Sequence, residues 1–167
     1  LSKILSDTEE WIEIIVTENQ ILFKAENLLF FSRLLDGNYP ATNNMIPKQW
    51  KTEIKLETKS FMDAIDRALL LTQDAKNNVV NLKGFESGEI ELTSISPEIG
   101  KVKENLTSLG YEGEELRISF NGKNITDALR VIESTEVIIR FTGAMSPFVI
   151  KPVEHDNMLH LFSPVRT

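Results

Sequence analysis

The chain has 167 residues, with 18 basic and 25 acidic side chains and a formal net charge of −7. Its 41% hydrophobic and 26% charged residues are typical of a globular domain and exclude a disordered chain. No apolar run reaches the roughly 18–20 residues of a membrane-spanning helix. The absence of cysteine excludes disulfides and thiolate metal sites and is typical of the cytoplasm, and so acidic a chain is not expected to wrap nucleic acid.

The first 44 residues predict a short helix followed by strands. Apolar residues at positions 1, 4 and 5 have helical spacing, and alternating or apolar runs at 11–16, 21–25 and 28–35 predict three strands joined by turns. A cluster of turn formers at 36–40 opens a polar, extended stretch that reaches Pro47 and is the best linker candidate. The chain begins without Met inside an amphipathic pattern, so we expect it to be a piece of a longer protein.

A new unit begins at residue 52. Residues 52–56 alternate as a strand does, and Thr58 is a suitable N-cap for a helix from 59 to about 73, whose apolar seam runs through Phe61, Ile65 and Leu69. Three further strands are expected at 78–82, 89–93 and 100–106.

The second half repeats this plan. Residues 56–65 recur 64 positions later as 120–129, so that Lys59 aligns with Lys123 and Asp63 with Asp127. A strand at 115–120, a helix from Asn121 to about 132 and strands at 137–141, 147–150 and 159–162 follow, while a weaker third copy opens the chain. The fold class is therefore α+β: duplicated β-α-β-β-β units, with two helices packed on curved antiparallel sheets.

Several segments resemble one family. Residues 32–40, 77–80, 96–98, 119–121 and 161–166 resemble, in this order, segments of the bacterial DNA sliding clamp, the beta subunit of DNA polymerase III. The resemblance covers essentially the whole chain. It would place residues 1–44 in the later part of the second clamp domain and residues 45–167 as the complete third domain, with the DNA-clamp fold.

The resemblance implies a non-catalytic processivity factor without a cofactor. In that family a ring of two subunits surrounds double-stranded DNA without sequence preference. Short linear peptides of the polymerase III catalytic subunit, the clamp loader and repair polymerases dock on it, and no membrane is involved. A ring that slides must bind DNA only weakly, so an acidic composition is compatible with a ring that surrounds DNA. The cations expected to face DNA lie on the repeated helices, and solvated surface charges are the alternative: Lys59, Arg67, Lys123 and Arg130.

The resemblance also implies a peptide-binding pocket and a dimer interface. The pocket would comprise Pro40, Asn44, Met45, Asn121, Asn124, Met145, Pro147, Leu161, Ser163, Pro164, Val165 and Arg166. Methionine and proline suit an adaptable apolar groove, although Met45 and Met145 could instead fill core gaps and Pro164 could merely end a strand. The family often has an aromatic residue where Asn124 stands, and other pocket walls would precede residue 1. Leu70 and Leu71 would belong to the apolar dimer interface, or to the core.

Two other functions stay open at this point. A peptide-binding scaffold could share the repeat without encircling DNA. A small hydrolase could use Glu154, His155 and Asp156, although a charged turn explains these residues as well, and the chain has neither a phosphate-binding glycine loop nor metal-ligand spacing.

Overall fold

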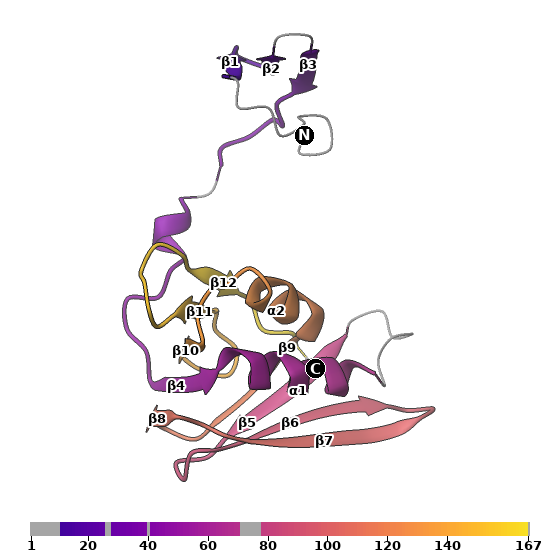
Figure 1. Ribbon diagram of the computed structural model, residues 1–167, viewed down its shortest axis with the longest axis vertical. Coiled ribbons are helices and arrows are strands. Elements are labelled where there is room, and N and C mark those ends of the chain that lie inside the picture. Colours follow the sequence, from indigo (N-terminus) through magenta and orange to yellow (C-terminus); the bar gives the residue numbers. More distant parts are fainter. Residues whose placement is uncertain (1–10, 26–27, 40, 71–77, 167) are drawn as a thin grey trace. The chain divides into compact units, whose positions relative to one another are not determined.

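The computed structural model describes residues 11–25, 28–39, 41–70 and 78–166. The chain divides into two compact units, residues 1–41 and residues 42–167 (Figure 1). The helix expected at residues 1–5 lies outside the described residues. Among the described residues, no helix is both long and apolar enough to cross a membrane.

The first unit is a three-stranded antiparallel sheet. Strands β1 (Glu13–Val16), β2 (Gln20–Ala25) and β3 (Leu28–Arg33) follow one another in sheet order, as two consecutive hairpins. Phe23 and Phe30 are register partners whose ring centroids lie 6.1 Å apart. The three strands expected here are therefore confirmed.

The described residues of the second unit form two antiparallel sheets and two α-helices. One sheet has the strand order β12-β11-β10-β4-β8 and the other the order β7-β6-β5-β9. After the 3₁₀ turn η1 (Thr42–Asn44), the elements are β4 (Thr52–Glu57), α1 (Thr58–Leu69), β5 (Val79–Gly84), β6 (Glu89–Ser96), β7 (Gly100–Thr107), β8 (Gly110–Gly113), β9 (Leu116–Asn121), α2 (Gly122–Leu129), β10 (Glu136–Phe141), β11 (Phe148–Pro152) and β12 (His160–Phe162).

The two repeats exchange their first strands. β4 pairs with β10 of the second repeat, and β9 pairs with β5 of the first, so each sheet contains strands of both repeats. Equivalent hydrogen bonds join the helix starts to the partner repeat: the Thr58 N–H donates to Thr135 O and the Gly122 N–H to Asn78 O, both at 2.9 Å. The duplication expected from the sequence is thus present in the strand order and in these contacts.

The core lies where the apolar faces of the helices meet the inner faces of the sheets. Phe61, Ile65 and Ala68 of α1 and Ile125 and Leu129 of α2 are buried. In β4, β5 and β10 every second side chain is buried, as expected for strands with one covered face. Full burial of one large aliphatic or aromatic side chain contributes about 1.5–3 kcal/mol, so this alternation is the main source of stability. The helices pack against each other, and α1 also packs on β6 and β7.

Three local expectations need correction. Thr58 is the first residue of α1, not its cap; Glu57 is the N-cap, and the buried Thr58 hydroxyl donates instead to Ser134 O at 2.7 Å. Both helices end earlier than their apolar pattern predicted, at Leu69 and Leu129. Strand β8 was not expected, because its four residues include two glycines. The N-cap at Asn121 is confirmed, since its Oδ1 accepts from the Asn124 N–H at 3.1 Å.

Candidate functional site

The four cations expected to face DNA lie on the two helices or at the end of one. Lys59 and Arg67 belong to α1, Lys123 to α2, and Arg130 is the C-cap of α2; all four side chains are exposed. Three of the four therefore lie on the helices as expected, and Arg130 directly follows α2.

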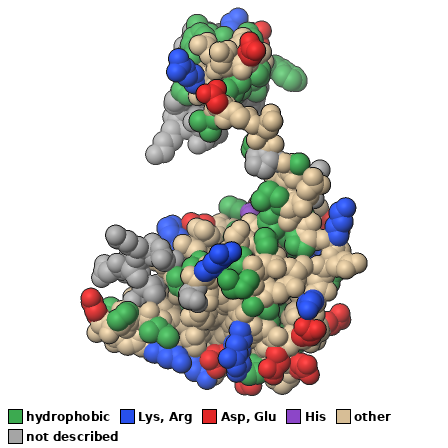
Figure 2. All heavy atoms as spheres, turned by 180° about the vertical axis from the view of Figure 1, so that it is seen from behind, with side chains coloured by type: hydrophobic (Ala, Val, Ile, Leu, Met, Phe, Trp, Pro, Cys, Tyr) green, Lys and Arg blue, Asp and Glu red, His purple; other side chains and the backbone are tan. Residues whose placement is uncertain are grey.

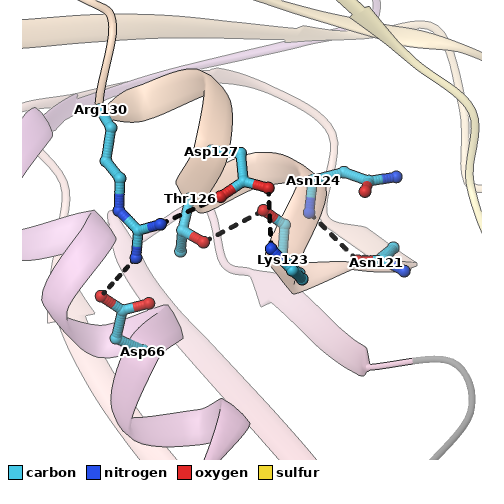
Figure 3. Close-up of polar contacts among 7 residues, drawn as sticks. All are labelled: Asp66, Asn121, Lys123, Asn124, Thr126, Asp127 and Arg130. Carbon is cyan, nitrogen blue, oxygen red and sulfur yellow. Dashed lines mark hydrogen bonds and ion pairs between the residues drawn. The ribbon is translucent and has the colours of Figure 1, made fainter. Parts of the chain in front are cut away.

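Carboxylates pair with three of these cations. Asp127 accepts from Lys123 Nζ at 3.1 Å and from Arg130 Nη1 at 3.0 Å, and Arg130 Nη2 reaches Asp66 of α1 at 3.8 Å (Figure 3). Arg67 donates through Nε and Nη2 to one oxygen of Glu104 on β7, at 3.0 and 2.8 Å. The helix surface is therefore only weakly basic, which is consistent with a surface that does not hold phosphates tightly.

The C-terminal tail brings several of the expected pocket residues together. Leu161 on β12 faces its register partner Val149, and Pro147 directly precedes the next pair, Phe148 with Phe162. The tail then runs along β9, where the Val165 N–H donates to Ser119 O at 2.8 Å. Met145 is 61% exposed and lines the same groove as Val165. Such an exposed methionine does not fill a core gap.

The other described residues expected in the peptide-binding pocket, and those expected in the dimer interface, do not line this groove. Asn121 caps α2, and Asn124 is exposed in its first turn. Met45 is 51% exposed, and its N–H donates to Thr42 O within the η1 turn at 2.9 Å. Asn44, Ser163 and Arg166 are exposed and Pro164 is half-buried. Pro40 and Leu71 lie outside the described residues, while Leu70 is 62% exposed and does not belong to the core.

A groove beside the tail was not anticipated from the sequence. It has a volume of about 480 Å³, and its floor is the outer face of β5, β6 and β9. Ser119 Oγ donates to Asn81 Oδ1 at 2.6 Å across this floor. The lining residues are Asn81, Leu82, Lys83, Glu91, Thr93, Arg117, Ile118, Ser119, Ala144, Met145 and Val165. The sequence contained one signal for this groove: the repeat aligns Arg117 with Glu53, so the two equivalent positions carry opposite charges.

The candidate hydrolytic residues have structural contacts. The Glu154 carboxylate accepts from the N–H and the hydroxyl of Thr135 at 3.1 and 2.9 Å, which lowers the pKa of Glu154. Asp156 accepts from Lys151 at 2.6 Å, and this contact lowers the pKa of Asp156. Carboxylates with lowered pKa values are poor proton acceptors. Within the described part of the chain, no cluster of three His, Cys, Asp or Glu side chains could hold a metal ion.

Comparison with known proteins places this fold in a family. Two family models match consecutive parts of the chain. The central domain of the DNA polymerase III beta subunit matches residues 1–41, and the C-terminal domain of that subunit matches residues 43–166. The chain belongs to this family. The α+β clamp fold expected from the sequence is confirmed.

Individual relatives agree. The chain is 61% identical to the beta sliding clamp of Halalkalibacterium halodurans and 53% identical to that of Bacillus subtilis, in each case over all 167 residues and 44% of the relative. A crystal structure of the Bacillus subtilis sliding clamp matches with a TM-score of 0.85 over 99% of this chain and 44% of that one. The beta chain from Streptococcus pneumoniae matches with a TM-score of 0.86 at 38% identity. The chain thus spans less than half the length of these relatives.

Proposed function

We propose that this chain acts as part of a DNA sliding clamp, a non-catalytic processivity factor of replication. The observation that supports this most is the ordered match of two consecutive clamp domains across almost the whole chain. In this proposal residues 1–44 belong to the second clamp domain and residues 45–167 form the third. The protein works in the cytoplasm, as part of a homodimeric ring around double-stranded DNA.

The helices face the DNA in this proposal. Lys59, Arg67, Lys123 and Arg130 contact phosphates, which carry no sequence information. Because Asp66, Asp127 and Glu104 compete for three of these cations, each phosphate contact is weak and exchanges quickly. A ring held on DNA by its closed shape needs no tighter contact, and it can slide. Leu70, exposed at the end of α1, contributes with Leu71 to the subunit interface.

The tail surface is the docking site for client proteins. Met145, Pro147, Leu161 and Val165 offer apolar, adaptable contacts, and Asn121, Asn124 and Arg166 can fix a peptide backbone. Pro40, Asn44, Met45, Ser163 and Pro164 complete the proposed set. Clients would be the polymerase III catalytic subunit, the clamp loader and repair polymerases, each through a short peptide.

A peptide titration tests the docking site. A synthetic peptide with paired apolar residues after a glutamine should shift the backbone amide signals of residues 119–124, 145 and 161–166. Met145→Ala and Arg166→Ala should each weaken binding about tenfold, which is typical of a buried contact residue at an interface. Ile99→Ala, which truncates an equally exposed side chain in the β6–β7 turn, should change nothing. A titration without amide shifts in the tail would refute this site.

A scaffold that binds peptides without encircling DNA is the alternative. The pairing of Arg67, Lys123 and Arg130 with carboxylates favours it, because these contacts reduce the charge available for phosphate. Both functions predict peptide binding, so only a measurement on circular DNA separates them.

A further inference from the structure

At one pair of equivalent facing positions, the outer surfaces of the two sheets carry different combinations of charge. In the five-stranded sheet, Glu53 on β4 faces Arg140 on β10, and Arg140 Nε donates to the Glu53 carboxylate at 2.6 Å. At the equivalent positions of the four-stranded sheet, Arg117 on β9 faces Lys83 on β5. Like charges directly opposite each other on neighbouring strands destabilise a sheet. The five-stranded sheet therefore has an ion pair where the four-stranded sheet has two facing cations.

The surrounding charges neutralise this pair only in part, because Glu91 of β6 faces Lys83 from the other side. Lys101 and Lys103 of β7 lie on the same outer face as Glu89 and Glu91 of β6, and Glu91 is paired with Lys103 at 2.6 Å. Among the described residues no carboxylate forms an ion pair with Arg117 or Lys101. In the lower part of Figure 2, several basic side chains lie towards the left and several acidic ones towards the right, with both signs mixed between them. A chain of net charge −7 thus has a locally basic sheet face.

This basic face leads to the tail. Arg117 and Lys83 line the same groove as Met145 and Val165, the two residues that the groove shares with the proposed docking site. A peptide seated on the tail would therefore continue over the outer face of β9 and β5. We propose that this groove binds an acidic, extended segment that flanks the docking peptide of a client protein. The inference rests on the proposed function, because that peptide supplies the anchor.

A peptide suits this groove better than a nucleic acid. Single-stranded nucleic acids bind on aromatic side chains that stack with bases, and none of the described residues that line the groove is aromatic. Glu91 lies within the groove and would repel a phosphate backbone, whereas a peptide can place a neutral side chain beside it. The helices proposed to face duplex DNA lie on the other side of this sheet, where Arg67 of α1 meets Glu104 of β7.

The test compares four peptide probes on the 167-residue chain. Three are synthetic docking peptides that differ only in their flank, which is four glutamates, four serines or four lysines. Each flank is tested once at the N-terminal end and once at the C-terminal end of the docking peptide. The fourth is the glutamate flank without the docking residues. At low salt the glutamate flank should tighten binding about tenfold over the serine flank, because several exposed charge pairs form together. The gain should disappear at high salt.

Matched variants separate the groove from the fold. Arg117→Glu should abolish the gain from the glutamate flank, yet it should raise the urea midpoint, since it recreates the opposite-charge arrangement of Glu53 and Arg140. Lys83→Glu should also abolish the gain. In addition, the peptide with the lysine flank should bind the Arg117→Glu variant more tightly than it binds the original chain. Lys55→Gln, which removes a cation from the outer face of the other sheet, is the control and should leave the gain intact.

Each outcome decides the matter. Equal affinity of the three flanks would overturn the inference while leaving the docking site in place. If no docking peptide binds, the docking site is refuted. Amide shifts of residues 83, 117 and 119 with the isolated glutamate peptide would then still support an acid-binding groove, and their absence would overturn it. Stronger shifts of the same amides with oligothymidylate would assign the groove to nucleic acid and contradict the inference.

Discussion

At the scale of single residues, the two repeats are not interchangeable. Gly122 opens α2 at the position where Thr58 opens α1. A Cβ at Gly122 would lie 2.8 Å from Val80 Cγ2, closer than real Cβ atoms come, and a tight 3.0 Å from side-chain carbons of Ile65 and Leu69. Glycine is needed there because α2 approaches α1 and β5 closely. At the equivalent position of α1 there is room for a side chain, and the Thr58 hydroxyl donates to Ser134 O.

Gly122→Ala tests this close approach. The added methyl group should destabilise the fold by about 1–3 kcal/mol, the usual cost of overpacking a core, measured as the change in unfolding free energy in urea. Gly110→Ala is the control, because the nearest atom to its new Cβ, Lys55 Cβ, is at 3.7 Å. Equal stability of Gly122→Ala and the original chain would show that α2 can move away from α1.

The carboxylates near residue 155 predict a dependence of stability on pH. The pKa of Glu154 is lowered by the hydrogen bonds from Thr135, and the pKa of Asp156 by Lys151. When folding lowers the pKa of a carboxylate, its charged form stabilises the folded state. This stabilisation is fully present above the pKa of the unfolded state, about 4, and is lost as the pH falls through the pKa of the folded state. Glu154→Gln should therefore make the urea midpoint less sensitive to pH below about 4. An unchanged pH profile would contradict this assignment.

At the scale of elements, the sequence predicts strands with one buried face well. β4, β5 and β10 alternate because one side of each meets the helices, and this regularity is visible in the residues themselves. β8 was not predicted because two of its four residues are glycines, Gly110 and Gly113. Its half-buried large side chain, Tyr111, gives no alternating pattern by itself. The exchange of first strands between repeats could not be predicted either, since a period of two does not say which neighbour a strand pairs with.

The candidate site was predictable only in part. The pocket residues came from resemblance to the clamp family, and the structure brings Met145 and Val165 to one groove. The basic groove floor came from no motif, because Lys83 and Arg117 lie 34 positions apart and become neighbours only through the β5–β9 pairing. The one usable signal was that aligned positions 53 and 117 carry opposite charges.

At the scale of the whole molecule, charge distinguishes three surfaces of the second unit. The helix surface is weakly basic because carboxylates pair with its cations. The outer face of the five-stranded sheet has two ion pairs, Glu53 with Arg140 and Glu136 with Lys55, and Glu112 of β8 faces Glu53. The outer face of the four-stranded sheet keeps unpaired cations. This distribution is consistent with the proposed function, in which the inner side slides on DNA and the outer side recruits proteins.

Retention on circular DNA tests the sliding function most directly. In a chimera, this chain would replace the matching 44% of the Bacillus subtilis sliding clamp, to which it is 53% identical. After loading onto nicked circular DNA, the chimera should stay bound through a wash at high salt and leave once the circle is cut, because a closed ring is held by topology and not by charge. Equal loss from circular and linear DNA, with a folded chimera, would contradict the account.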